Sequence, residues 1–165
     1  MIDFQQLLKA FVERKVEFII VGGVAATIHG SARLTQDLDI VYQRTPENFE
    51  RLVAAIDPYK PYLRGAPPGL PFTWDSQTLE SGLNFTLTTT IGDIDLLGEI
   101  TGGGDYDKLL SDCVTVRVFQ CEVRCLGLER LIYVKRAAGR PKDLEAIAEL
   151  EAILDESQGK PEATG

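Results

Sequence analysis

Two aspartates stand one residue apart at the start of an apolar run, in Asp37-Leu-Asp39-Ile-Val. Successive side chains of a β-strand point to opposite faces, so both carboxylates would lie on the same face. Neighbouring carboxylates repel each other, and both remain charged only beside a counter-charge. A divalent cation with oxygen ligands supplies that charge, with Mg²⁺ expected first and Mn²⁺ as the alternative. The spacing therefore predicts a metal site on a strand.

A glycine pair precedes the aspartates. Gly22-Gly23 follows a short apolar run, residues 18–21, which predicts a buried strand, and the small-residue segment 24–29 predicts a short helix. A double glycine lets the backbone approach a phosphate closely, with helix N–H groups directed at it. A phosphate cradle followed by metal-binding aspartates is the layout of a nucleotide site. The alternative is a tight turn followed by a solvated acidic strand.

These motifs resemble a known family. Gly-Gly, a short helix and Asp-Leu-Asp-Ile are similar to the signature of the polymerase-β-type nucleotidyltransferase superfamily, and residues 29–40 (H-G-S-A-R-L-T-Q-D-L-D-I) resemble small prokaryotic nucleotidyltransferase-like proteins, some of them parts of toxin–antitoxin systems. The resemblance implies that Gly22 and Gly23 hold the phosphates of a nucleoside triphosphate (NTP). It also implies that Asp37, Asp39 and a third carboxylate bind two Mg²⁺ ions, while an acceptor attacks the α-phosphate and pyrophosphate leaves.

The third carboxylate has two candidates. Asp93 and Asp95 would share one face of a strand that follows a predicted turn. In the resembled proteins this acid is usually flanked by apolar residues, which favours Asp95, because Ile94 and Leu96 surround it. Asp93 adjoins the turn and is the alternative. Three acids on adjacent strands indicate bound cations, as in two-metal phosphoryl-transfer sites.

Cationic residues in two segments are candidates for nucleotide binding. Arg33 and Thr35 lie just before the aspartates, where a cation could pair with phosphate oxygens, and the resembled family carries the same Arg-x-Thr. Lys135 and Lys142 lie in a joint between two predicted helices, K-R-A-A-G-R-P-K-D, and could clamp a triphosphate. The alternatives are a surface arginine beside a turn and cations that favour a helix C-terminus.

Two further residues have weaker indications. His29, the single histidine, could contact the nucleotide or transfer a proton, although such a residue more often caps or packs a helix end. Arg64 lies in a proline-rich excursion, residues 57–72, and could reach a substrate. Neither is included among the predicted site residues.

Periodicity along the chain predicts an α/β (α+β) fold, in which a mixed, largely antiparallel sheet is flanked by helices and followed by a C-terminal helical pair. Predicted helices cover residues 3–15, 46–56, 128–138 and 141–154, and predicted strands cover 18–21, 83–90, 93–97, 114–119 and 122–126. We expect one nucleotidyltransferase-like domain over residues 1–156, with its helical part at 127–156, and a disordered tail at 157–165.

Composition narrows the classes of function. The 165 residues include 25 acidic and 17 basic side chains, a net charge of −8 that argues against broad DNA binding. No membrane-spanning run or signal peptide is expected, and three cysteines without Cys-x-x-Cys spacing are typical of reduced thiols in a cytoplasmic protein.

The predicted activity is therefore Mg²⁺-dependent transfer of a nucleoside monophosphate from an NTP to an unknown acceptor, which could be a protein hydroxyl, a tRNA end or a small molecule. A non-catalytic, nucleotide-binding or antitoxin-like partner of another protein is the alternative. A metal-dependent phosphohydrolase is a third interpretation, but the chain lacks the histidines common in such sites.

Overall fold

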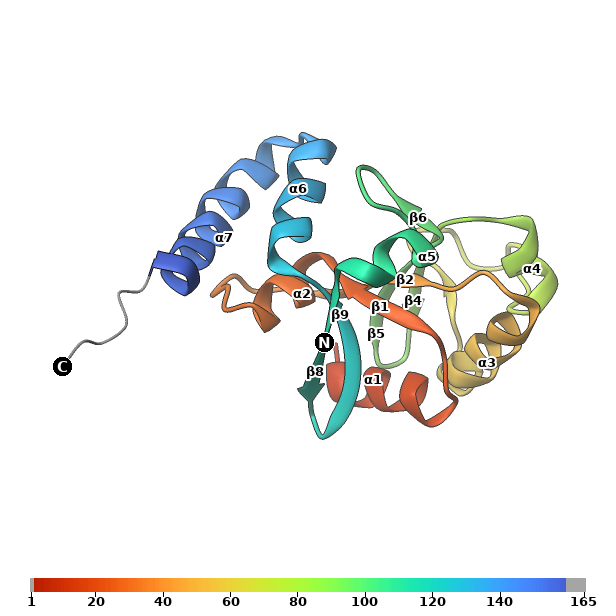
Figure 1. Cartoon of the computed structure of the whole chain (residues 1–165). Coiled ribbons are helices and arrows are strands. Elements are labelled where there is room, and N and C mark those ends of the chain that lie inside the picture. Colours follow the sequence, from red (N-terminus) through yellow and green to blue (C-terminus); the bar gives the residue numbers. More distant parts are fainter. Residues whose placement is uncertain (1, 160–165) are drawn as a thin grey trace.

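A mixed sheet forms the centre of the computed structural model, which describes residues 2–159 (Figure 1). Its strands are β1 (Phe18–Val21), β2 (Asp37–Tyr42), β3 (Tyr62–Leu63), β4 (Phe85–Thr89), β5 (Gly92–Leu97), β8 (Cys113–Val118) and β9 (Cys121–Leu126). They lie in the order β3-β4-β5-β2-β1-β9-β8, with β2–β5 and β1–β9 parallel and the other neighbours antiparallel. A separate small ribbon pairs β6 (Glu99–Ile100) with β7 (Gly104–Asp105).

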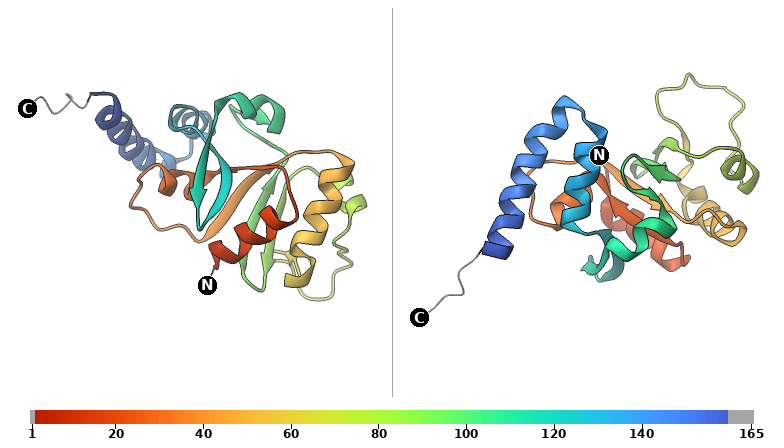
Figure 2. Two further views of the ribbon diagram at one scale, coloured as in Figure 1. Left: turned by 60° about the horizontal axis from the view of Figure 1, so that its bottom comes forward. Right: turned by 45° about the horizontal axis from the view of Figure 1, so that its top comes forward.

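Helices flank this sheet and continue beyond it. They are α1 (Phe4–Glu13), α2 (Gly22–Ile28), α3 (Pro46–Ile56), α4 (Ser76–Ser81), α5 (Tyr106–Leu109), α6 (Leu128–Ala138) and α7 (Pro141–Gly159), with 3₁₀ turns at Asp57–Tyr59 and Leu110–Asp112. Figures 1 and 2 show α6 and α7 side by side, on the opposite side of the molecule from α3 and α4. The predicted architecture, a mixed sheet with flanking helices and a C-terminal helix pair, is confirmed.

The local signals of α3 explain why its bounds were predictable. The Thr45 side chain accepts a hydrogen bond from Asn48 N at 3.2 Å. Pro46 occupies the first helical position, where a backbone N–H would have no partner within the helix, so its absence in proline costs no hydrogen bond. The Asn48 side chain in turn is fully buried and bonds the backbone of Glu17 and Gln43. These bonds fix the entrance of α3 against the end of β2.

Other bounds differ from the sequence-based expectation. The short helix α2 begins at Gly22 itself rather than at residue 24, because the chain turns directly from β1 at a glycine with φ +68°. Helix α7 continues to Gly159, so residues 157–159 of the predicted disordered tail are helical. The rest of that predicted tail, residues 160–165, lies outside the described residues.

The sheet supplies the rigid support for the aspartates. All of β1 is buried. In β2 the apolar residues Leu38 and Ile40 are fully buried, while Asp37 and Asp39 face away from them and are partly buried. The C-terminal helices add Ile132 to the same apolar cluster, together with Leu131, Ile147 and Leu150. Within residues 2–159, no helix has the length and apolar character needed to cross a membrane.

Candidate active site

Three carboxylates converge where β2 and β5 run in parallel. The register sets Asp37 beside Asp93 and Asp39 beside Asp95, so all four side chains lie on one face of the sheet. One carboxylate oxygen from each of Asp37, Asp39 and Asp95 lies within 4.8 Å of the other two. Asp93 is outside this group. The geometry thus groups Asp95, rather than Asp93, with the Asp-x-Asp pair.

The charge of this cluster is incompletely balanced. Burial, followed by the carboxylates of Asp95 and Asp37, raises the pKa of Asp39 to about 8. Among the described residues, Asp39 Oδ1 and Asp95 Oδ1 are buried oxygens without a hydrogen-bond donor. Orphaned anionic oxygens fit a hard divalent cation such as Mg²⁺ or Mn²⁺, which would bind as Asp39 loses its proton.

Gly22 and Gly23 leave room for side chains of the site that a larger residue would displace. A Cβ at Gly22 would collide with the Asp39 carboxylate, and a Cβ at Gly23 would lie 2.6 Å from Thr35 Oγ1. Thr35 Oγ1 also donates to the Asp37 carbonyl oxygen at 3.2 Å. The absence of side chains at these positions therefore lets α2 approach the carboxylate-bearing face of the sheet and the segment that leads into β2.

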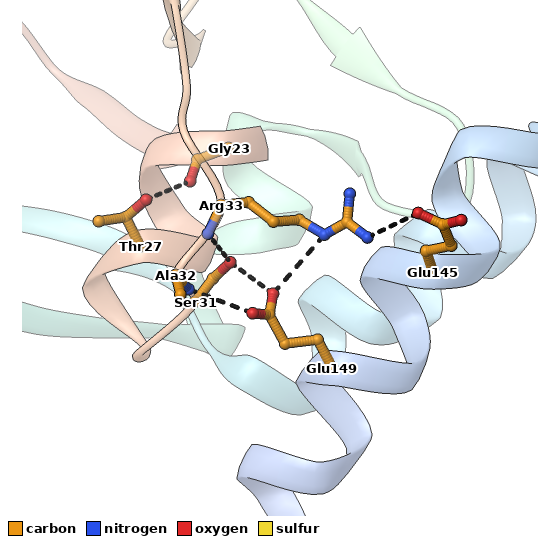
Figure 3. Close-up of polar contacts among 7 residues, drawn as sticks. All are labelled: Gly23, Thr27, Ser31, Ala32, Arg33, Glu145 and Glu149. Atoms are coloured by element: carbon orange, nitrogen blue, oxygen red, sulfur yellow. Dashed lines mark hydrogen bonds and ion pairs between the residues drawn. The ribbon is translucent and has the colours of Figure 1, made fainter.

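Arg33 makes its ion pairs with α7. Figure 3 shows its guanidinium between Glu145, at 3.1 Å, and Glu149, at 3.8 Å. Glu149 also accepts hydrogen bonds from Ser31 Oγ, at 2.5 Å, and from Ala32 N, at 3.1 Å. This network ties the segment before β2 to α7. Arg33 lines the cavity described next, but its charged end is paired with carboxylates.

A polar cavity of about 330 Å³ opens beside the carboxylates. The predicted residues Gly22, Gly23, Arg33, Thr35, Asp37, Asp39, Asp95, Lys135 and Lys142 all line it, together with Arg140 and Asp143. Desolvation lowers the pKa of the half-buried Lys135, an effect that the carboxylates of Asp143 and Asp39 oppose. The fold thus brings the helix joint, about a hundred residues downstream, to the glycine pair and the aspartates.

Arg140 also lines the polar cavity. The sequence placed it in the joint between the two C-terminal helices but did not assign it to the site. Its Nε donates to Asp143 Oδ2 at 2.8 Å, and the side chain of Asp143 is almost entirely buried. Burial would raise the pKa of Asp143, but the hydrogen bonds and charge of Arg140 lower it overall. The buried carboxylate therefore holds Arg140 at the cavity.

A second cavity, of about 420 Å³, is also lined by Asp39 and is mainly apolar. It is lined by Val21, Gly22, Asp39, Leu97, Glu99, Ile100, Thr101, Leu131, Val134, Lys135, Ala138 and Arg140. Gly22, Asp39, Lys135 and Arg140 line both cavities, so the two spaces meet at the carboxylates.

His29 has a structural partner. Its Nε2 lies 2.7 Å from the Leu126 carbonyl oxygen, so this nitrogen carries the proton and donates it. His29 lines neither of the two cavities at the carboxylates. The contact joins the end of α2 to the end of β9, which matches the packing role of a histidine at a helix end.

Arg64 is the residue of the carboxylate cluster that the sequence did not assign. Its guanidinium lies 3.6 Å from Asp37, 3.3 Å from Asp93 and 3.0 Å from Asp95. The residue follows the two-residue edge strand β3, and the loop beyond it stands away from the sheet in the right view of Figure 2. No local motif marks it, because only the pairing of β3 with β4 brings it to the aspartates.

No protein-family model matches the chain, and no curated protein matches its sequence. Solved structures share its fold. The lincomycin-bound lincosamide antibiotic adenylyltransferase LnuA matches with a TM-score of 0.60 and 15% identity, over 92% of this chain and 98% of that chain. ANT(2")-Ia, in complex with adenylyl-2"-tobramycin, matches with a TM-score of 0.58 and 17% identity, over 94% of this chain and 87% of that chain. TM1012, a nucleotidyltransferase candidate from Thermotoga maritima, matches with a TM-score of 0.53 and 16% identity, over 94% of this chain and 96% of that chain. These matches establish the nucleotidyltransferase-like fold.

Proposed function

We propose that this protein is a Mg²⁺- or Mn²⁺-dependent nucleotidyltransferase that moves a nucleoside monophosphate from an NTP to an acceptor. The observation that carries the proposal is the convergence of Asp37, Asp39 and Asp95 beside a cavity walled by cationic side chains. Two proteins that share the fold are adenylyltransferases or hold an adenylylated product, which supports the reaction class.

In this proposal the three carboxylates hold divalent cations on the rigid face of β2 and β5. When bound, these cations would stabilise negative charge on the α-phosphate and on the departing pyrophosphate. Asp39 carries a proton at neutral pH without a cation, because of its raised pKa, and releases that proton as its carboxylate becomes a ligand. The sheet keeps the donor oxygens together, so little reorganisation is needed when substrate arrives.

The polar cavity is proposed as the binding site for the β- and γ-phosphates. Lys135 and Lys142 line it and would pair with phosphate oxygens, while Gly22, Gly23 and Thr35 form the opposite wall. Arg140 adds a cation that Asp143 holds in place. Arg33 would join them by exchanging its partners on α7 for phosphate oxygens.

The mainly apolar cavity is proposed to admit an organic part of one of the two substrates. An in-line displacement requires the acceptor oxygen to approach the α-phosphate opposite the leaving pyrophosphate. With pyrophosphate in the polar cavity, the adjoining apolar cavity, which shares Asp39 with it, is the space proposed for this approach. Its volume, about 420 Å³, suits a small molecule, so small acceptors are the first to test against protein and tRNA acceptors.

The direct test is calorimetric titration of each NTP with Mg²⁺ into the wild type and into Asp37→Ala/Asp39→Ala. We expect binding that requires the cation and disappears in the double variant, while Asp155→Ala, an exposed position on α7, retains it. Transfer is then measured with α-labelled NTP and candidate acceptors. Wild type that binds no NTP would overturn the proposal, and binding without transfer to any acceptor would favour a nucleotide-binding or antitoxin-like partner.

A further inference from the structure

The Arg64 side chain is held in place by the backbone of the sheet. Its Nη2 donates to the carbonyl oxygens of Leu87, at 2.9 Å, and Ile94, at 3.2 Å, which are cross-strand partners in β4 and β5. Its own N–H donates to the Thr86 carbonyl oxygen at 3.0 Å. The side chain is 27% exposed. None of these bonds involves a carboxylate, so a cation at the aspartates would not compete for them.

The guanidinium faces the carboxylates as a charge rather than as a hydrogen-bond donor. Arg64 Nη2 is 3.0 Å from Asp95 Oδ1, yet that oxygen has no aligned hydrogen bond among the described residues, and neither does Asp39 Oδ1. Both oxygens therefore keep lone pairs available for a cation. Asp93 lies at 3.3 Å from Arg64 Nε.

Resting on the proposed function, we propose that Arg64 is a fixed counter-charge that lowers the affinity of the carboxylates for a divalent cation, so that at limiting cation the site fills only once nucleotide is bound. In the free protein its positive charge lies next to Asp37 and Asp95, so a divalent cation at these carboxylates meets a like charge a few ångströms away. A bound triphosphate adds several negative charges at the same place and offsets that repulsion. Arg64 thereby disfavours a cation-loaded site that lacks a nucleotide.

The test compares Mn²⁺ affinity, read from the electron paramagnetic resonance signal of free Mn²⁺, with and without a non-hydrolysable NTP analogue. We expect Arg64→Gln to bind Mn²⁺ about tenfold more tightly than wild type without nucleotide, because one like charge is removed. With the analogue both proteins should bind Mn²⁺ more tightly, and the roughly tenfold ratio between them should persist, because the Coulomb energies of separate charge pairs add. Arg64→Lys retains the charge and should remain close to wild type.

Arg44 offers a matched control. It also donates to two backbone carbonyl oxygens, those of Leu79 and Glu80, but it lies beyond the end of β2 opposite to Asp37. Arg44→Gln removes the same charge and the same kind of bonds, and it should leave Mn²⁺ affinity unchanged. Circular dichroism of each variant verifies that its fold is retained.

The outcomes separate this inference from the proposed function. Wild type that binds Mn²⁺ while folded Arg64→Gln binds it equally or more weakly would overturn the inference and leave the metal site standing. Tight binding by Arg64→Lys, equal to that of Arg64→Gln, would overturn the argument from charge. Absence of Mn²⁺ binding in wild type and Arg64→Gln, even with the analogue, would overturn the inference together with the metal site on which it rests.

Discussion

Asp39 on β2 and Asp95 on β5 are direct partners in a parallel register, which places two carboxylates side by side on one face of the sheet. An isolated pair of this kind destabilises the fold unless a proton, an arginine or a metal compensates the charge. Here a proton on Asp39 and the guanidinium of Arg64 are the compensation that the chain itself provides. Several measurable properties depend on this relationship.

Stability without metal should fall as the pH rises. Asp39 has a pKa of about 8 in the folded protein and an ordinary value of 3.8, so between these values the folded chain holds a proton that the unfolded chain lacks. The contribution of this proton to the free energy of unfolding is therefore complete below about pH 4 and is lost as the pH rises through about 8. Asp39→Asn removes this titration. We expect the melting temperature of the variant to exceed that of wild type by several degrees at pH 9 in EDTA, and by much less at pH 5.

Addition of Mg²⁺ provides the control for this pH effect. The cation replaces the proton as the counter-charge, so it should raise the melting temperature of wild type at pH 9 and leave Asp39→Asn nearly unchanged. If the melting temperatures of wild type and Asp39→Asn in EDTA change with pH in parallel, this would contradict a raised pKa at Asp39.

Gly22→Ala should destabilise the protein and disrupt the site. The new methyl group would collide with the Asp39 carboxylate, and the backbone there has φ +68°, which disfavours a side chain. We expect a loss of about 3 kcal/mol in the free energy of unfolding. Gly65→Ala is the matched control, because Gly65 has φ +78° and a methyl group added there would have no neighbouring atom within 4 Å. It should cost only about 1 kcal/mol, and equal losses in chemical denaturation would argue against the collision.

Lys135→Gln should weaken NTP binding about tenfold. Lys135 is half-buried where the two cavities meet, so solvent and salt would screen the attraction between its ammonium group and a phosphate only weakly. Lys142→Gln should have a smaller effect, since Lys142 is exposed. Lys9→Gln on α1, which removes a lysine paired with Glu13 on the surface, should have none. Calorimetry with Mg²⁺ and NTP measures all three, and equal affinities for Lys135→Gln and Lys9→Gln would contradict the proposed phosphate site.

Arg33 and Glu145 should affect NTP affinity in opposite directions. Glu145→Gln removes an exposed carboxylate that pairs with Arg33 at 3.1 Å, and it should tighten NTP binding about twofold by releasing the guanidinium. Arg33→Gln should weaken binding about fivefold, in proportion to one lost phosphate contact. Glu156→Gln, an exposed change on the same helix, controls for net charge. If Arg33→Gln binds NTP as tightly as wild type, Arg33 serves only to tie its segment to α7.

Local patterns sufficed wherever neighbouring residues determine the structure. The alternation around Asp37 and Asp39 placed both carboxylates on one face, and the capping residues of α3 marked its start, because strand periodicity and helix caps act over a few residues. The C-terminal helix pair followed from its breaker, Gly139, which ends α6 in a left-handed conformation.

Long-range contacts were decided by the tertiary structure alone. Which of Asp93 and Asp95 lies with the Asp-x-Asp pair depended on the register between β2 and β5, which sets Asp95 beside Asp39. The position of Arg64 depended on the pairing of a two-residue edge strand. The pairing of Arg33 with Glu145 likewise required α7 to pack beside the segment before β2. Such contacts join residues far apart in the chain, and their geometry comes from sheet register and helix packing, which no short pattern of residues records.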